Sequence, residues 1–189
     1  MYQAEILTRA DAEKLATNIL EENNITETPV NVVNIAKNYD IKIYYLLEKK
    51  REKNRINKLG LVRIKDGNPE IIIKPGLTPE AQQFAIAHML GHIFMGHVHS
   101  APKQRIKESP DMFYIVRSAE EEDLANVFAM ALLMPESQIQ YYLAQPISFA
   151  REYVEASEED YEIAEKCCVP ANIALVWRLY LTRIKGLKY

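Results

Sequence analysis

The sequence predicts a helix-rich α+β fold with a small β-sheet. In several segments a helix start signal is followed by apolar residues at helical spacing, and two short β-branched runs flank a turn of the kind found in hairpins. The chain has 189 residues, 48% of them hydrophobic, and contains no internal repeat or low-complexity linker. We therefore expect one domain over residues 1–189, with a core at about 8–145 and a C-terminal helical portion at about 146–189.

The N-terminal half is expected to supply two helices and the sheet. Thr8 is a candidate N-cap for the first helix, and Thr28 and Pro29 interrupt that pattern before the second. Residues 66–69, Asp-Gly-Asn-Pro, favour a turn and would join the last two strands into a hairpin. The expected helices are 8–23 and 30–40, and the expected strands are 41–47, 59–64 and 70–73.

The C-terminal half is expected to be helical. Thr78 and Pro79 open the helix with the clearest start signal, because Thr is a favoured N-cap and Pro is favoured at the first helical position. The expected helices are about 78–97, 119–133, 158–167 and 170–184, and residues 137–143 can add a further short turn. The apolar residues of the last helix have ordinary core patterning: Ile173, Val176, Trp177, Tyr180, Leu181 and Ile184.

Composition argues against several classes of function. Lys and Arg total 23 against 26 Asp and Glu, so the net charge of -3 is not that of a general nucleic-acid binder. The first residues lack the features of a signal peptide, and no apolar run approaches the roughly 18 residues of a membrane span. We expect a soluble, cytoplasmic protein that binds neither membranes nor nucleic acid directly. Cys167 and Cys168 are neighbours, so we expect two reduced, partly buried thiols.

Two histidines and an acidic run have the spacing of a metal site. His88 and His92 are four residues apart in an expected helix, so both imidazoles project from one face about one turn apart. A zinc site of this kind needs a third protein ligand and keeps one position for water or substrate. The acidic residues 120–123 open the next expected helix and can supply that ligand. Spacing alone does not distinguish this site from two unrelated histidines.

Two motifs resemble the ImmA/IrrE family of metallopeptidases. Members typically show F-x-x-A-H-E-x-G-H on one helix and E-x-x-A-N-x-F-A-x-x-L-L-M-P on the next. The matching positions are Phe84, Ala87, His88, Gly91 and His92, then Glu122, Ala125, Asn126, Phe128, Ala129, Leu132, Leu133, Met134 and Pro135. The resemblance extends over the preceding strands and the C-terminal helical pair, and it implies a zincin-like core.

The resemblance implies a zinc ion bound by His88, His92 and Glu122. Glu121 takes the third position if the alignment of this helix is off by one residue. In such sites a glutamate directly after the first histidine removes a proton from the attacking water. Met89 occupies that position here, and a thioether cannot shuttle a proton. Because general acid–base catalysis contributes roughly 10²- to 10⁴-fold, we expect hydrolysis to be lost or strongly weakened.

Three functional hypotheses follow. The first is a zinc protein of the metallopeptidase family that acts on or binds a helix-turn-helix transcriptional repressor, the partner that the resemblance implies, with hydrolysis lost or weakened. The second is an active zinc endopeptidase that uses a substitute base, Glu120 or Glu121, or a metal-bound hydroxide. The third is a metal-free interaction module that keeps only the fold. Met89 also has a purely structural interpretation, as a side chain that fills space near the cleft.

Two further features are assigned no role in this site. A third histidine at metzincin spacing would fall at Val98, so His97 and His99 are expected to be surface residues at the helix end, where a cation suits the helix dipole. The run at 49–58 has six basic residues and one acid. We expect it to be a solvated loop, with contact to an acidic partner or a DNA backbone as the alternative.

Overall fold

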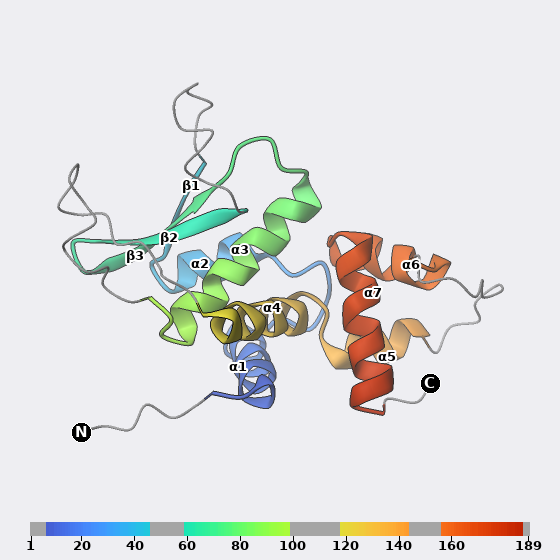
Figure 1. Ribbon diagram of the computed structural model, residues 1–189. Coiled ribbons are helices and arrows are strands. Elements are labelled where there is room, and N and C mark those ends of the chain that lie inside the picture. Colours follow the sequence, from blue (N-terminus) through green and yellow to red (C-terminus); the bar gives the residue numbers. More distant parts are fainter. Residues whose placement is uncertain (1–6, 46–58, 99–117, 144–155, 187–189) are drawn as a thin grey trace.

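The computed structural model describes residues 7–45, 59–98, 118–143 and 156–186. These ranges form α1 (Arg9–Glu22), α2 (Val32–Asn38), β1 (Lys42–Tyr45), β2 (Gly60–Lys65), β3 (Asn68–Ile73), α3 (Pro79–Phe94), α4 (Ala119–Leu133), α5 (Glu136–Leu143), α6 (Glu158–Cys167), α7 (Ala171–Leu179) and the π-helix η2 (Tyr180–Ile184). The expected α+β class is confirmed. The sheet and the α5–α7 group lie on opposite sides of α3 and α4 (Figure 1). None of the described helices is both long and apolar enough to span a membrane.

The sheet has the strand order β1-β3-β2. β2 and β3 form the expected antiparallel hairpin, whose loop is only Asp66 and Gly67, with φ angles of 51° and 82°. Positive φ at both positions is what a type I′ turn requires, and Asp-Gly is a favoured pair for it. Asn68 and Pro69, expected in the turn, therefore belong to β3. β1 pairs parallel with β3, a pairing that the sequence pattern did not indicate.

Helix α3 lies between the sheet and α4. Thr78 caps it as expected, with its hydroxyl accepting a hydrogen bond from the backbone N–H of Ala81. Every residue from Phe84 to His92 is buried, because β2 and β3 contact the helix on one side and α4 contacts it on the other. A helix enclosed in this way is normally apolar all round. Two histidines in its buried centre are therefore exceptional, and each needs a polar partner.

Helix α4 packs between α3 and α1. Both α1 and α4 begin with a capping box, in which Thr8 pairs with Asp11 and Ser118 pairs with Glu121. These reciprocal bonds satisfy backbone N–H groups that have no partner within the helix. The N-caps therefore fix where α4 starts, and with it the register of the acidic residues in its first turn.

The C-terminal helices close over the far end of α4. The indole N–H of Trp177 donates a 2.9 Å hydrogen bond to the carbonyl oxygen of Met134, the C-cap residue of α4. Trp177 and Leu181 are buried as expected, but Val176 and Ile184 are 52% and 68% exposed, so that part of the core prediction is wrong. The chain becomes a π-helix at residue 180, and its wider turn removes Ile184 from the face of Trp177.

The two cysteines are free thiols, as expected. Cys167 is buried and Cys168 is partly buried. Burial raises the pKa of the Cys167 thiol to about 12, so it is not a thiolate at neutral pH. Residues 46–47 of the expected first strand and the basic run 49–58 lie outside the described residues.

Candidate metal centre

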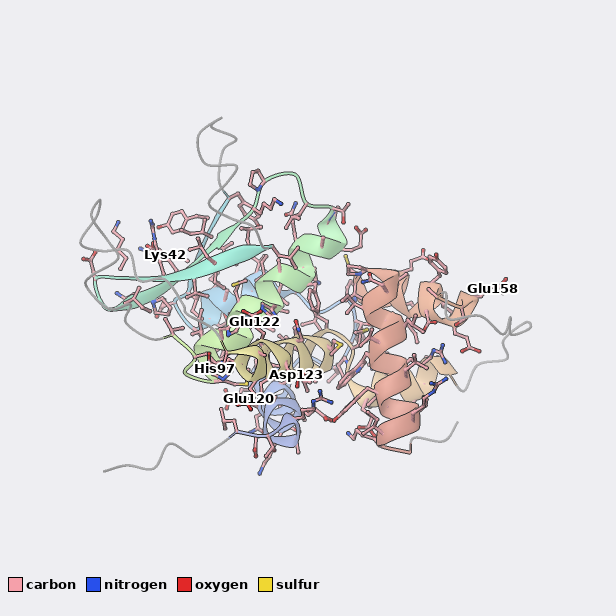
Figure 2. The ribbon with its side chains drawn as sticks, viewed as in Figure 1. Lys42, His97, Glu120, Glu122, Asp123 and Glu158 are labelled. Carbon is pink, nitrogen blue, oxygen red and sulfur yellow. The ribbon has the colours of Figure 1, made fainter. Side chains whose placement is uncertain are left out.

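Three side chains that the sequence singled out converge between α3 and α4. The Nε2 atoms of His88 and His92 are 3.1 Å apart, with the ring planes at 83°. Oε2 of Glu122 lies 3.4 Å from Nε2 of His88, and Oε1 lies 3.9 Å from Nε2 of His92. Glu122 occupies the first turns of α4, close to the end of α3 (Figure 2). The two imidazoles and the carboxylate thus face one common point.

The close contact of the two helices depends on Gly91. A Cβ atom at this position would lie 3.0 Å from Cδ1 of Phe128 and 3.2 Å from the carbonyl oxygen of Ala125. Any larger residue would therefore push α4 away from α3. Because Ala125 follows Glu122 by about one helical turn, this contact also sets how near Glu122 comes to the histidines.

The other acids of the run have different surroundings. The carboxylate of Glu121 accepts a 2.9 Å hydrogen bond from the backbone N–H of Ser118 and completes the capping box. Asp123 accepts two hydrogen bonds from Arg9 of α1, of 2.8 Å and 2.9 Å. Glu120 is exposed. Of the two positions left open by the sequence motif, Glu122 rather than Glu121 faces the histidines.

The spacing of the three groups fits one small metal ion. In a tetrahedral zinc site with Zn–N distances of about 2.0–2.1 Å, neighbouring ligand atoms are about 3.3 Å apart. The distances of 3.1, 3.4 and 3.9 Å around His88, His92 and Glu122 are close to that value. One anionic and two neutral ligands are also a donor set that zinc accepts, with one position left for water or substrate. The group can therefore hold a metal ion.

His88 contains an unpaired buried atom. Among the described residues, its Nδ1 is the buried side-chain nitrogen without a hydrogen-bond partner. Leaving such an atom unpaired costs about 1–3 kcal/mol. The other ring nitrogen, Nε2, faces His92 and Glu122 and is the one placed to bind a metal ion.

The structure corrects the sequence interpretation of His97. This residue was expected on the surface, but it is 6% exposed, and its Nδ1 lies 3.3 Å from Nδ1 of His92. The signal that was missed is Gly96, whose φ of 70° ends α3 with a left-handed residue and turns the chain back over the helix. His99 lies outside the described residues.

Met89 lies in the hydrophobic core. It is 1% exposed and belongs to the same buried cluster as the apolar residues on both sides of α3. Its burial agrees with the structural interpretation, in which the thioether fills space. The position directly after the first histidine thus carries an apolar side chain and no acid or base.

Comparison with known proteins identifies the family. The sequence profile of the IrrE N-terminal-like domain, a peptidase family, matches residues 36–176. The chain belongs to this family, as its two helix motifs indicated, and members of the family are in general zinc-dependent.

The fold is also found in solved structures. The chain is similar to a Mycobacterium tuberculosis transcriptional regulator, with a TM-score of 0.53 and 15% sequence identity. The similarity covers 90% of this chain and 47% of that chain, so this chain spans about half the length of the regulator. At this identity the likeness shows the fold alone. No curated protein sequence matches the chain significantly.

Proposed function

We propose that the chain is a zinc-binding member of the IrrE-like family that binds a helix-turn-helix transcriptional repressor and has lost most or all peptide hydrolysis. One observation carries this proposal. The His88, His92 and Glu122 side chains are assembled with the spacing of a metal centre, yet the adjacent position 89 holds a buried methionine. The ligand set is kept while the proton carrier is missing.

The ligands and the missing base have separable roles. His88 and His92 would hold zinc through Nε2, and Glu122 would hold it through its carboxylate. Zinc bound there would polarise a peptide carbonyl group. Met89 can neither accept a proton from an attacking water nor pass one to the leaving amine. Losing general acid–base catalysis lowers a rate roughly 10²- to 10⁴-fold, whereas metal binding does not require that residue.

The two acids considered as substitute bases are poorly placed for that role. Glu121 forms the capping box with Ser118, and the exposed Glu120 does not belong to the converging group of ligand atoms. Both precede Glu122 on α4, whereas the missing base belongs to α3. We therefore favour weakened hydrolysis over an active enzyme with a substitute base.

The partner is proposed from the family and from the shared fold. Family membership supports a role in acting on repressors, and the structure of similar fold is that of a transcriptional regulator. The net charge of -3 gives no support for direct binding to DNA. A protein partner, bound near the metal centre without being cut, agrees best with these observations.

The metal proposal is tested by zinc content. Plasma emission spectrometry of untagged protein should find about one zinc per chain, which His88→Ala and Glu122→Ala should abolish. Glu120→Ala is the matched control, because it removes an exposed acid from the same helical turn and should retain the metal. Absence of zinc from the wild-type protein would support the metal-free interaction module instead.

The pseudopeptidase proposal is tested with purified helix-turn-helix repressors. The zinc-loaded chain is incubated with each repressor, complex formation is followed by size-exclusion chromatography, and chain lengths are read by mass spectrometry. The expected result is a complex that contains the intact repressor. Cleavage that a chelator abolishes would show an active peptidase and would reject the loss of hydrolysis.

A further inference from the structure

His97 contacts the edge of the His92 ring that faces away from the candidate metal site. The Nδ1 atoms of the two residues are 3.3 Å apart, and the ring centroids are 5.4 Å apart at an interplanar angle of 63°. Nε2 of His92 lies on the opposite edge, near His88 and Glu122. His92 is 0% exposed and His97 is 6% exposed, so bulk water has little access to this contact. His92 is thus held at both ring nitrogens.

The backbone brings His97 to this position by a Schellman motif. The N–H of Gly96 bonds to the carbonyl of Ile93, and the N–H of His97 bonds to the carbonyl of His92 at 2.9 Å. This pair of bonds, with a left-handed glycine between the two segments, reverses the chain at the end of α3. His97 is therefore bonded to His92 through the main chain as well as through the side chain.

We propose that His97 is a positioning residue that fixes the tautomer and orientation of His92 by accepting a hydrogen bond from its Nδ1–H. A neutral imidazole carries one proton, so of two facing Nδ1 atoms one must donate and the other accept. A histidine that presents its Nε2 lone pair to a metal carries its proton on Nδ1. His92 is then the donor, and His97 carries its own proton on Nε2. The inference rests on the proposed metal site.

The two candidate ligands are held differently. His88 has no partner for Nδ1 among the described residues, whereas His92 has an imidazole there. Hydrogen-bond partners at the second nitrogen of a metal-bound histidine set its orientation, and losing one typically weakens metal binding 10- to 100-fold. His92 is therefore the ligand that the protein orients in advance, and His97 is the residue that orients it. His97 itself faces the wrong edge of His92 to share the same metal.

Zinc affinity gives the first readout. His97→Leu removes the acceptor, whereas His97→Asn retains one, because Oδ1 of asparagine takes about the place of Nδ1. Competition with a chromogenic zinc chelator should show 10- to 100-fold weaker binding for His97→Leu and near wild-type binding for His97→Asn. Val98→Ala is the matched control, since Val98 is the partly buried neighbour and its loss should leave the affinity unchanged. Equal affinity of the leucine variant and the wild type would overturn the inference.

The tautomer of His92 gives a readout that does not depend on metal. Ring ¹⁵N chemical shifts in metal-free protein should show His92 protonated at Nδ1 in the wild type and in His97→Asn, and a mixture of tautomers in His97→Leu. If the wild-type protein binds no zinc but shows this pattern, the metal proposal fails and the positioning role stands. If His92 is protonated at Nε2, or if the leucine variant keeps the wild-type tautomer, the positioning role fails whatever the zinc content.

Discussion

Gly91 of α3 lies against Ala125 of α4, so that a Cβ atom on the glycine would lie 3.3 Å from the Cα atom of Ala125. The contact joins the two helices that carry the candidate ligands. His88 and His92 flank Gly91 on α3, and Glu122 precedes Ala125 by one turn on α4. The spacing of the metal centre thus depends on the absence of a side chain.

Gly91→Ala is expected to weaken zinc binding more than it weakens the fold. Alanine is favoured over glycine within a helix by about 1 kcal/mol, which offsets part of the roughly 1–3 kcal/mol that overpacking costs. The unfolding free energy should therefore change little or fall modestly. Separation of the helices moves Glu122 from the histidines, so zinc affinity should fall at least tenfold. Urea unfolding in the presence of a chelator and zinc competition measure the two effects separately. Unchanged zinc affinity would show that α4 tolerates the shift.

Met89→Glu tests whether the missing base limits hydrolysis. Since general acid–base catalysis is worth roughly 10²- to 10⁴-fold, the variant should cut a susceptible repressor or peptide at least a hundredfold faster than the wild type. Met89→Gln is the matched control, with nearly the same shape and no basic group, and should remain inactive. A comparable rate for the wild type and the glutamate variant would mean that another group already supplies the base.

The same substitution should lower stability. Met89 is 1% exposed, and burying a carboxylate in place of a thioether has a desolvation cost that also raises the pKa of the new acid. We expect a lower melting temperature for Met89→Glu than for Met89→Leu, a volume-conserving change that should cost less than about 1.5 kcal/mol. Scanning calorimetry of both variants, with a chelator present, measures the two melting temperatures and checks which is lower.

Local signals in the sequence predicted most elements, and the resemblance to the family implied the three side chains that converge between α3 and α4. The expected N-caps Thr8 and Thr78 start their helices where polar side chains can satisfy free N–H groups, and the Asp-Gly pair fixes the hairpin. The parallel pairing of β1 with β3 was not predictable in this way, because it joins segments about 28 residues apart and leaves no local pattern.

The burial of His97 depends on backbone geometry and not on the type of residue. Histidine is polar, and its place after the helix suggested the surface, but backbone geometry at Gly96 decided its position. A Schellman ending always brings the second residue after the C-cap back to the third-last helical residue, which here is His92. The exposure of Ile184 was also not predictable from the sequence, because the π-helix η2 has no sequence signal of its own.

Trp177→Phe should destabilise the packing of α7 on the end of α4. The variant leaves the buried carbonyl of Met134 without the indole N–H, and a lost partner of this kind costs about 1–3 kcal/mol, with a further cavity cost. Urea unfolding should therefore show a lower midpoint with an unchanged slope. Tyr180→Phe, which removes a 2.6 Å hydrogen bond to the partly buried Glu13, is the comparison and should cost less. Equal losses of unfolding free energy in the two variants would show that the Trp177 hydrogen bond stabilises the fold no more than the Tyr180 hydrogen bond does.

Asp160 and Arg178 form an ion pair that joins α6 to α7. Asp160 is 0% exposed, and it accepts hydrogen bonds of 2.7 Å and 3.0 Å from Arg178 and of 2.8 Å from the backbone N–H of Ser157. Burial opposes ionisation and acts to raise the pKa of Asp160, but the hydrogen bonds from Arg178 and Ser157 outweigh it. The pKa therefore lies below the ordinary value of 3.8.

This pKa shift predicts how stability depends on pH. The unfolded chain, with the ordinary pKa of 3.8, binds the proton more readily than the folded chain. The stabilisation is therefore fully present above the unfolded pKa and is lost as the pH falls through the lower, folded-state pKa. At pH 7, Asp160→Asn should cost up to about 3 kcal/mol, because Arg178 loses its closest counter-charge and is left with the longer 3.7 Å contact to Glu159, while the amide keeps one acceptor oxygen. The difference between wild type and variant in urea unfolding should narrow below pH 3.8. If the difference in unfolding free energy between the two proteins stays constant with pH, Asp160 stabilises the fold through its shape and hydrogen bonds and not through its charge.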